Sequence, residues 1–360
     1  MSRVFVTGAG FSHAAGVPVL NGMLEAILDF GGQSYDEPQL SETWKVPRKP
    51  GATKAYLEML LKTYSDFYGV SEKNRNRQPN LEEFFTFMDE FSEMQNLRGT
   101  FDLLWLVEQG PRPIILLLGE YLWSFTKRDK ACPSIAAFAS MLNKKDTVIT
   151  FNWDNLLERA LFRQGKRFQS LFDVSAVPDS KEGDERISQK EIRILKLHGS
   201  IDWRDAKVDE IQAYGHIALG TGWEITEGQC GPDGKRLKVT RVRMPLERGE
   251  FDKSSFHSLG DPELALPVFH KRFVDPYIRE AWLAADRSLA FADEVIFIGY
   301  SLPQADRQAR LLFQLSLKDR RRKKPPVVKV VNPDENVIQK LAGIFPNVQH
   351  AAKTLEEFVA

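Results

Sequence analysis

The chain is poor in cysteine, carries no excess charge of either sign and contains no long hydrophobic run. Its 360 residues include two cysteines, Cys132 and Cys230, which argues against a secreted protein stabilised by disulfides. Two cysteines are also too few for a zinc site that one chain builds from four of them. Lysine plus arginine and aspartate plus glutamate number 49 each. The formal net charge is therefore zero, and no overall basic field exists to hold nucleic acid.

Two further absences concern location. No apolar segment reaches the length of a membrane-spanning helix, and no secretory signal precedes the first predicted strand. We therefore expect a cytoplasmic protein with no membrane contact and no direct nucleic-acid binding. The one dense basic stretch, residues 318–324, is better explained as a solvated helix end.

Short apolar segments alternate with helical patterns along the chain. We predict six strands, at residues 3–7, 147–151, 192–197, 294–298, 327–331 and 347–350. Strands that are apolar throughout indicate a sheet covered on both faces, and the alternation predicts an α/β fold with a doubly wound, parallel, Rossmann-like sheet. Ligands of such sheets bind at the carboxyl ends of the strands.

The predicted strands leave two insertions within a single domain, 1–360. Its core would comprise residues 1–20, 147–204 and 267–360, with a helical insertion at 21–146 and a small one at 205–266. Helical patterns at 54–68, 80–94, 101–108 and 113–126 predict a helical lid over the nucleotide fold. Five of its residues form an apolar face that we expect to be core: Phe84, Phe85, Phe87, Met88 and Phe91. Alternating patterns at 211–219 and 236–244 favour a hairpin or small sheet.

A turn of small residues follows the first predicted strand. Gly8, Ala9 and Gly10 allow a sharp turn and a close approach to a ligand, and we expect a helix to begin near Ser12. Free N–H groups at a helix start favour a phosphate group. The alternative is a tight strand–helix turn that binds nothing.

Four segments, in this order, resemble the sirtuin (SIR2-like) family of NAD-consuming proteins: GAGFSHAAGVP, TFNWDNLLERAL, LKLHGSIDW and IGYSLPQAD. They begin at Gly8, Thr150, Leu195 and Ile298. The resemblance covers about half of the chain and is closest to the bacterial SIR2-like branch that degrades NAD in anti-phage defence. It implies NAD as the bound molecule. Deacylase sirtuins also carry a four-cysteine zinc ribbon, which this chain cannot build, so we expect no metal.

The resemblance implies three catalytic residues. Asn152 would orient the ribose or an attacking water, and Asp154 would support the pocket. His198 would act as the general base, because an imidazole with a pKa near 6.5 suits that role at cytoplasmic pH. Asn152 could instead be a turn residue. Asp154 could be a helix N-cap, a role that is compatible with the first.

The resemblance also implies ten cofactor-binding residues. Gly299, Tyr300 and Ser301 correspond to the Gly-Thr-Ser of sirtuins at the adenosine end. Asn332 and Asp334 correspond to the adenine-ribose position, although a turn with a helix N-cap explains them equally well. The full set is Gly8, Ala9, Gly10, Phe11, Ser12, Gly299, Tyr300, Ser301, Asn332 and Asp334.

Departures from the deacylase pattern favour hydrolysis of NAD itself. Phe151 stands where deacylases have Gln, and the first motif continues as GVPVLNGM without their Phe and Arg. We predict an NAD hydrolase that is gated by homo-oligomerisation or by a separate sensor, ATPase or Argonaute-like chain. The alternatives are an NAD-dependent deacylase or ADP-ribosyltransferase, and a non-catalytic sensor of NAD or ADP-ribose. Glu158 lies on the helix after Asp154, and Glu158→Ala is expected to retain most activity.

Overall fold

The computed structural model describes most of the predicted core. The described residues are 2–33, 52–68, 79–98, 112–126, 132–170, 191–207, 224–226, 239–243, 262–264, 276–303, 306–317 and 324–360. The predicted helix at 101–108, the predicted strand at 211–219 and residues 318–323 of the basic stretch lie outside them.

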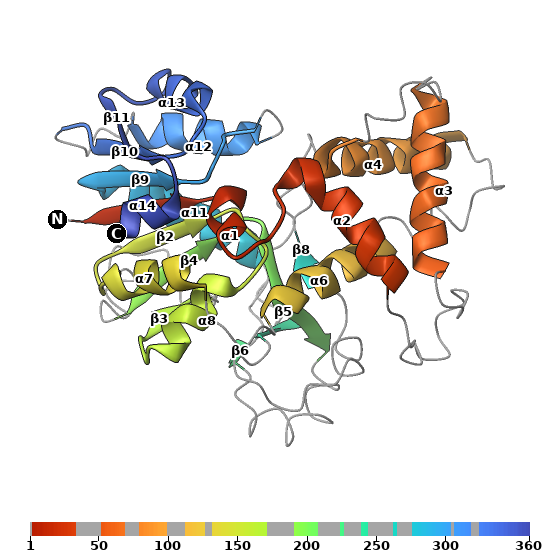
Figure 1. Cartoon of the computed structure of the whole chain (residues 1–360), viewed down its shortest axis with the longest axis horizontal. Helices are drawn as coiled ribbons and strands as arrows, with labels where there is room; N and C mark the ends of the chain where they lie inside the picture. The colour runs from red at the N-terminus through yellow and green to blue at the C-terminus, as the bar shows by residue number, and fades with distance from the viewer. Residues whose placement is uncertain are drawn as a thin grey trace, which may run out of the picture.

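Seven parallel strands form the central sheet (Figure 1), which confirms the α/β fold with a parallel sheet. Their order across the sheet is β11-β10-β9-β1-β2-β4-β3. Six of the seven lie where the apolar runs predicted them, and β3 is an additional two-residue strand at the edge. The strands are β1 Arg3–Thr7, β2 Thr147–Thr150, β3 Phe168–Gln169, β4 Ile192–Lys196, β9 Glu294–Ile298, β10 Val327–Val331 and β11 Val348–Ala352.

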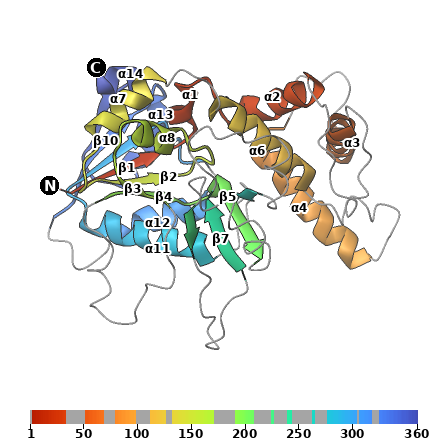
Figure 2. The ribbon, with the colours of Figure 1, turned by 90° about the horizontal axis from the view of Figure 1, so that it is seen from below.

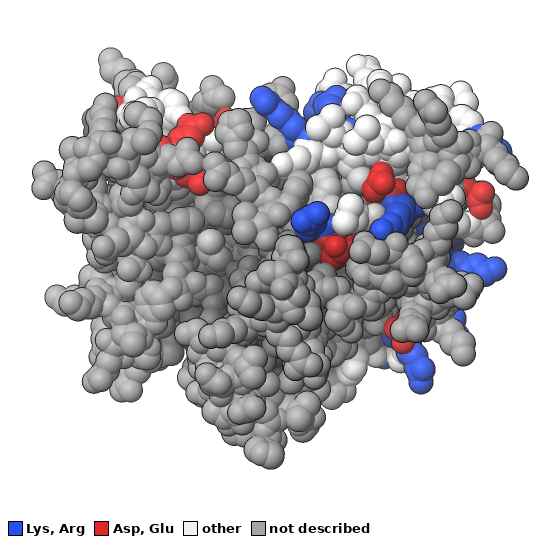
Figure 3. Space-filling model, turned by 180° about the vertical axis from the view of Figure 1, so that it is seen from behind, with Lys and Arg blue, Asp and Glu red and all other residues white. Residues whose placement is uncertain are grey.

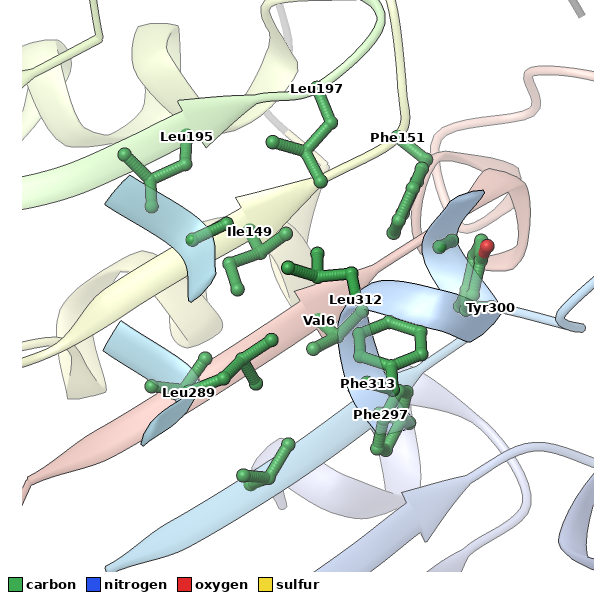
Figure 4. Close-up of a cluster of buried hydrophobic side chains, with 14 of the residues drawn as sticks. Val6, Ile149, Phe151, Leu195, Leu197, Leu289, Phe297, Tyr300, Leu312 and Phe313 are labelled. Atoms are coloured by element: carbon green, nitrogen blue, oxygen red, sulfur yellow. The ribbon is translucent and has the colours of Figure 1, made fainter. Parts of the chain in front are cut away.

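Helices cover both faces of this sheet, as the continuous apolar strands predicted. Because side chains alternate along a strand, Val4 and Val6 of β1 face one layer and Phe5 faces the other. The first layer, whose apolar side chains Figure 4 draws, contains α11 Pro276–Phe291, α12 Arg307–Leu317 and α13 Glu335–Ala342. The second contains α1 Ala9–His13, α7 Pro133–Met141, α8 Leu156–Arg163 and α14 Leu355–Val359.

A group of helices from the first insertion lies beside the sheet (Figures 1 and 2). Its members are α2 Leu20–Gln33, α3 Ala52–Phe67, α4 Leu81–Arg98 and α6 Arg112–Thr126. The apolar face of α4 is core, as predicted: Phe84, Phe85, Phe87 and Met88 are buried, and Phe91 packs against them. Trp153, which follows β2, belongs to the same cluster and joins these helices to the sheet.

The second insertion contributes a small antiparallel sheet of order β6-β7-β5-β8. Its strands are β5 Gly199–Lys207, β6 Glu224–Thr226, β7 Val239–Arg243 and β8 Pro262–Leu264. β7 lies inside the predicted strand at 236–244. β5 crosses the predicted boundary at residue 205, so it runs continuously from the core into the insertion.

The described surface mixes charges of both signs. On the face seen in Figure 3, Lys and Arg side chains lie among Asp and Glu side chains. Of the helices that the structure describes, none combines the length and hydropathy needed to cross a bilayer.

Candidate active site

A cavity of about 900 Å³ opens at the carboxyl ends of the parallel strands. The chain leaves β1 to build β2, β3 and β4 on one side, then returns to build β9, β10 and β11 on the other. The β1–β9 pair is therefore the topological switch point, where ligands of such sheets bind. The cavity is lined by the residues that directly follow β1, β2, β9 and β10, and by His198 near the end of β4. Its size suits a small molecule or cofactor.

The glycine-rich turn differs from the prediction in where its helix starts. α1 begins at Ala9, not near Ser12, with Gly8 as its extended N-cap. Three N–H groups of the turn donate to protein carbonyls. Gly8 donates to Ile298 (3.1 Å), Gly10 to Gly299 (2.9 Å) and Phe11 to Gly8 (2.9 Å). Gly8 is therefore the one residue that separates the end of β1 from the start of α1.

The glycines allow the backbone after β1 to cross closely over the backbone after β9. A Cβ atom on Gly10 would lie 2.7 Å from the Cα of Gly299, and one on Gly8 would lie 2.8 Å from the Cα of Tyr300. Gly299 has a φ of +61°, and a Cβ there would lie 2.4 Å from the backbone of Gly10. The turn after β1 therefore fits against the turn after β9 only when both are glycine.

Two residues of the predicted turn have different surroundings. Ala9 lines the cavity. The side chain of Phe11 instead packs edge-on against Phe138 in the second layer, with ring centroids 5.2 Å apart, and is 2% exposed. Any contact of Phe11 with a bound molecule would therefore come from its backbone.

A directed chain of hydrogen bonds joins Asn152, Ser12 and Asp154. Asn152 Nδ2 donates to the Gly8 carbonyl and to Ser12 Oγ, both at 2.8 Å, and Ser12 Oγ donates to Asp154 Oδ2 at 2.6 Å. A carbonyl and an ionised carboxylate can only accept, so this direction is fixed. Both amide hydrogens of Asn152 are thereby used, and the group it offers the cavity is Oδ1.

Asp154 also has the local role that the sequence left open. Its Oδ1 accepts the N–H of Leu156 at 3.2 Å, while the N-cap of α8 is Asn155. Asp154 thus supports the start of α8 with one oxygen and holds Ser12 with the other.

His198 lies in a buried cluster with an acid and two aromatic rings. Its Nε2 is 3.4 Å from Asp306 Oδ1, and the two side chains are 6% and 7% exposed. The Tyr300 hydroxyl donates to Asp306 Oδ2 at 3.0 Å. Phe151 stacks on Tyr300 with centroids 4.2 Å apart, as seen at the right of Figure 4, and meets the His198 ring edge-on at 5.1 Å. All four residues line the cavity.

Asp306 is the residue of this cluster that the sequence did not single out. It ends the segment IGYSLPQAD, but its spacing from His198 shows no pattern. The available signal was its place six residues after Tyr300, in a segment that follows a strand end.

Glu158, on α8, is buried and forms an ion pair with a lysine of the sheet. It is 2% exposed on α8, and its Oε1 lies 3.0 Å from Nζ of Lys196 on β4. Burial raises the pKa of Glu158; the charge of Lys196 opposes this rise and that of Asp202 adds to it. Lys196 Nζ also donates to the carbonyl of Asp154. Removal of Glu158 would leave the buried ammonium of Lys196 without its ion-pair partner, so we expect Glu158→Ala to lose stability. The expectation that this variant keeps most activity stays a prediction.

The residues predicted at the adenosine end also reach the cavity. Gly299, Tyr300, Ser301, Asn332 and Asp334 line it. Asp334 is in addition the N-cap of α13, where its Oδ1 accepts the N–H of Asn336 at 2.9 Å. Asn332 Oδ1 accepts the N–H of Asp334 at 2.9 Å. The turn and cap roles are therefore present, and contact with a ribose stays a prediction.

The search for metal ligands covers the described residues alone. Within those ranges, no group of three or more His, Cys, Asp or Glu side chains could hold a metal ion. Cys132 is a free cysteine whose Sγ contacts the Ala14 carbonyl at 3.3 Å.

The chain has distant similarity to several solved structures. Solved structures similar to this chain include one described as "The Structural basis of Sirtuin Substrate Affinity" (14% identity, TM-score 0.36, 99% of this chain and 90% of that chain). Another is a Sir2 homolog–NAD complex (14% identity, TM-score 0.36, 99% of this chain and 87% of that chain). Similarity at this level implies no shared activity.

The sequence comparisons are narrower. No curated protein matches the sequence. A family model described as a SIR2-like domain matches residues 146–216. The chain is thus similar to SIR2-like domains over the segment that carries Asn152, Asp154 and His198.

Proposed function

We propose that this protein is an NAD hydrolase of the SIR2-like type, which converts NAD and water to nicotinamide and ADP-ribose. One observation carries the proposal. The glycine turn, Asn152 and His198 come from segments far apart in sequence, and all line one cavity at the switch point of the sheet. The match to a SIR2-like domain over residues 146–216 supports NAD as the substrate.

The reaction suits the groups that line the cavity. Loss of nicotinamide leaves an oxocarbenium-like ribose, so the protein has mainly to position the substrate and stabilise charge. His198 would take a proton from the attacking water as its oxygen bonds to the ribose carbon and the bond to nicotinamide breaks. Asn152 Oδ1 would accept a hydrogen bond from a ribose hydroxyl or from that water, because both amide hydrogens are held by the protein.

Hydrolysis fits the site better than deacylation. The positions at which deacylases have Gln and Thr hold Phe151 and Tyr300, whose rings stack 4.2 Å apart. The segment that differs from the deacylase motif, residues 17–23, lines the cavity where it enters the helical group. Because the site departs from the deacylase pattern at both places, we favour water over an acyl-lysine as the acceptor.

We further propose that the activity serves anti-phage defence in the bacterial cytoplasm by depleting NAD. An ungated NAD hydrolase would be toxic to its own cell. Gating would come from homo-oligomerisation or from a separate sensor, ATPase or Argonaute-like chain. Assembly can be measured by analytical ultracentrifugation together with specific activity over a range of protein concentrations.

A product analysis tests the proposal against its alternatives. Purified protein is incubated with NAD, with and without an acetyl-lysine peptide, and the products are separated by chromatography. Equal amounts of nicotinamide and ADP-ribose without peptide support hydrolysis. Turnover that requires the peptide and yields acetyl-ADP-ribose would establish a deacylase instead. Binding of NAD without turnover under all these conditions would establish a sensor.

A further inference from the structure

We propose that Asp306 is a positioning residue for His198 and that Tyr300 holds Asp306 in place. The inference rests on the proposed function, in which His198 is the general base. It adds a carboxylate that selects which imidazole nitrogen takes the proton and stabilises the imidazolium that results. The three side chains come from the ends of β4 and β9 and from the loop before α12.

The atoms that face each other determine the tautomer. Asp306 Oδ1 faces Nε2 of His198 at 3.4 Å, and both side chains are more than nine-tenths buried. An ionised carboxylate can only accept, so Nε2 is the nitrogen that we expect to carry the proton in the neutral ring. The lone pair is then on Nδ1, which makes Nδ1 the basic atom. Protonation of Nδ1 gives an imidazolium beside a carboxylate, where burial strengthens their attraction.

Tyr300 restricts the carboxylate from its other side. Its hydroxyl donates to Asp306 Oδ2 at 3.0 Å, so each oxygen of Asp306 faces a different partner. The pKa of Tyr300 is well above its usual value because the phenol is buried and because Asp306 is negative. Tyr300 therefore remains a donor at every pH at which the protein is expected to work.

Phe151 packs against both His198 and Tyr300. Its ring stacks on Tyr300 at 4.2 Å with an interplanar angle of 14° and meets the His198 ring edge-on at 5.1 Å. In Figure 4 the Phe151 and Tyr300 rings face one another at the end of the sheet. The Phe151 ring therefore contacts both ends of the His–Asp–Tyr chain.

Two residues shortly after β9 have a positive φ. Gly299 has a φ of +61°, and Leu302, which is fully buried, has a φ of +49°. Leucine seldom adopts a positive φ, so the surroundings must hold it there. Further along this segment, Asp306 accepts the hydrogen bond from the Tyr300 hydroxyl.

Other charged side chains near the cluster also affect the pH at which His198 takes up a proton. Among the described residues, the other titratable or charged side chains that line the cavity are His13, Glu82, Asp154, Asp334, Lys353 and Glu356. Glu82 raises and Arg310 lowers the pKa of Tyr300, each less than burial and Asp306 do. Asp154 and Asp334 already hold Ser12 and Asn336. Asp306 Oδ1 lies within 4 Å of the imidazole Nε2.

The test is the pH dependence of NAD hydrolysis by Asp306→Asn. Loss of the carboxylate removes the tautomer selection and the charge beside the imidazolium. We expect kcat to fall by about 10²- to 10⁴-fold with KM little changed. The rising limb of kcat/KM against pH should move to lower pH, because a base without a neighbouring negative charge is protonated less readily. A merely structural residue would lower stability without moving this limb.

Two further variants keep the test valid if Asp306→Asn is unstable. Tyr300→Phe keeps the ring stack and loses the hydrogen bond, so we expect about a tenfold loss of kcat with folding retained. Asp286→Asn is the matched control, since that half-buried carboxylate on α11 accepts from Ser316 at 3.1 Å and does not line the cavity. It should match the wild type. An unmoved limb in Asp306→Asn, or unchanged turnover in both Asp306→Asn and Tyr300→Phe, would overturn the proposal.

Nitrogen NMR of His198 separates this inference from the proposed function. In the ¹⁵N-histidine protein, assigned with a His198→Asn variant, the wild type should show the Nε2–H tautomer, and Asp306→Asn should titrate at lower pH. If NAD is not cleaved but these signals are seen, the hydrolase proposal fails and the positioning role holds. An Nδ1–H tautomer in the wild type would refute the positioning role even in an active enzyme.

Discussion

Gly10 and Gly299 are the residues at which the sequence is least free to change. Their backbones cross so closely that a Cβ on Gly10 would lie 2.7 Å from the Cα of Gly299. The glycines were expected to make room for a phosphate group. Their lack of a side chain first allows the two backbones to cross. Loss of NAD binding in a Gly10 variant could therefore result from a disturbed crossing and not from a lost contact with NAD.

Substitution of Gly10 should therefore destabilise the fold as well as the site. We expect Gly10→Ala to lower the free energy of unfolding by about 1–3 kcal/mol, because the new methyl group has no space against backbone atoms. Urea titration measures this value. Gly343→Ala is the control, since its Cβ would meet the Lys340 carbonyl at 3.4 Å, an ordinary contact. Equal stability of Gly10→Ala and wild type would contradict the crossing.

Tyr300 gives a pH dependence of stability whose sign can be worked out. Its pKa in the folded protein lies well above the value near 10 of the unfolded chain. Its contribution is therefore fully present below about pH 10 and is lost as pH rises through the folded pKa, because the unfolded chain releases the proton first. Wild type should lose up to about 1.4 kcal/mol per pH unit above pH 10 relative to Tyr300→Phe. Urea titrations at pH 9 and 11 measure the difference, and an unchanged difference would contradict the burial of this phenol.

At the scale of elements, α8 is held on β4 by a buried ion pair as well as by apolar packing. Glu158→Ala should cost about 3–5 kcal/mol of unfolding free energy, because it leaves Lys196 charged and unpaired in the core. The double variant Glu158→Ala/Lys196→Met should recover a large part of that loss. Glu120, half-buried on α6 and outside the cavity lining, provides the matched Glu→Ala control. A Glu158→Ala loss no larger than that of Glu120→Ala would refute the account.

The sequence predicted most elements of the sheet because each strand is a short run of apolar, largely β-branched residues between turn residues. β1, β9 and β10 have the predicted bounds. β3 was missed because two residues carry no periodicity and are placed only by β4. The start of α1 was misplaced because three small residues were assumed to stay outside the helix. Lys196, a lysine inside an apolar strand, was the overlooked sign that a buried acid lies opposite.

At the scale of the molecule, the helical group and the sheet share a core and a cavity. Trp153 follows β2 yet belongs to the helical cluster, and Leu122 of α6 lines the cavity. Contacts of this kind join residues far apart in the chain and have no signature in local sequence. The same holds for the contact between His198 and Asp306. Most residues predicted from the sequence line one cavity, but the contacts between them were not predicted.

A single domain, as predicted for residues 1–360, should unfold as one unit. We expect coincident urea transitions by far-UV circular dichroism and by tryptophan fluorescence. The fluorescence of Trp123 and Trp153 reports on the core that the helical group and the sheet share, and circular dichroism reports on the helices of the whole chain. NAD at 100 times its Kd should shift both transitions equally and stabilise by about 2.7 kcal/mol. Two separate transitions, with only one of them moved by NAD, would show that the helical group is an independent domain.

The central claim is that Asn152 and His198 carry out NAD cleavage in the cavity at the switch point. The most direct measurement is the initial rate of nicotinamide release by wild type, Asn152→Ala and His198→Ala, over a range of protein concentrations that includes the assembled state. Asn143→Ala, at an exposed position before β2, is the control. We predict that both site variants lose about 10²- to 10⁴-fold in rate while they keep their fold and much of their NAD affinity by calorimetry. Nicotinamide release by His198→Ala at the wild-type rate would contradict the account.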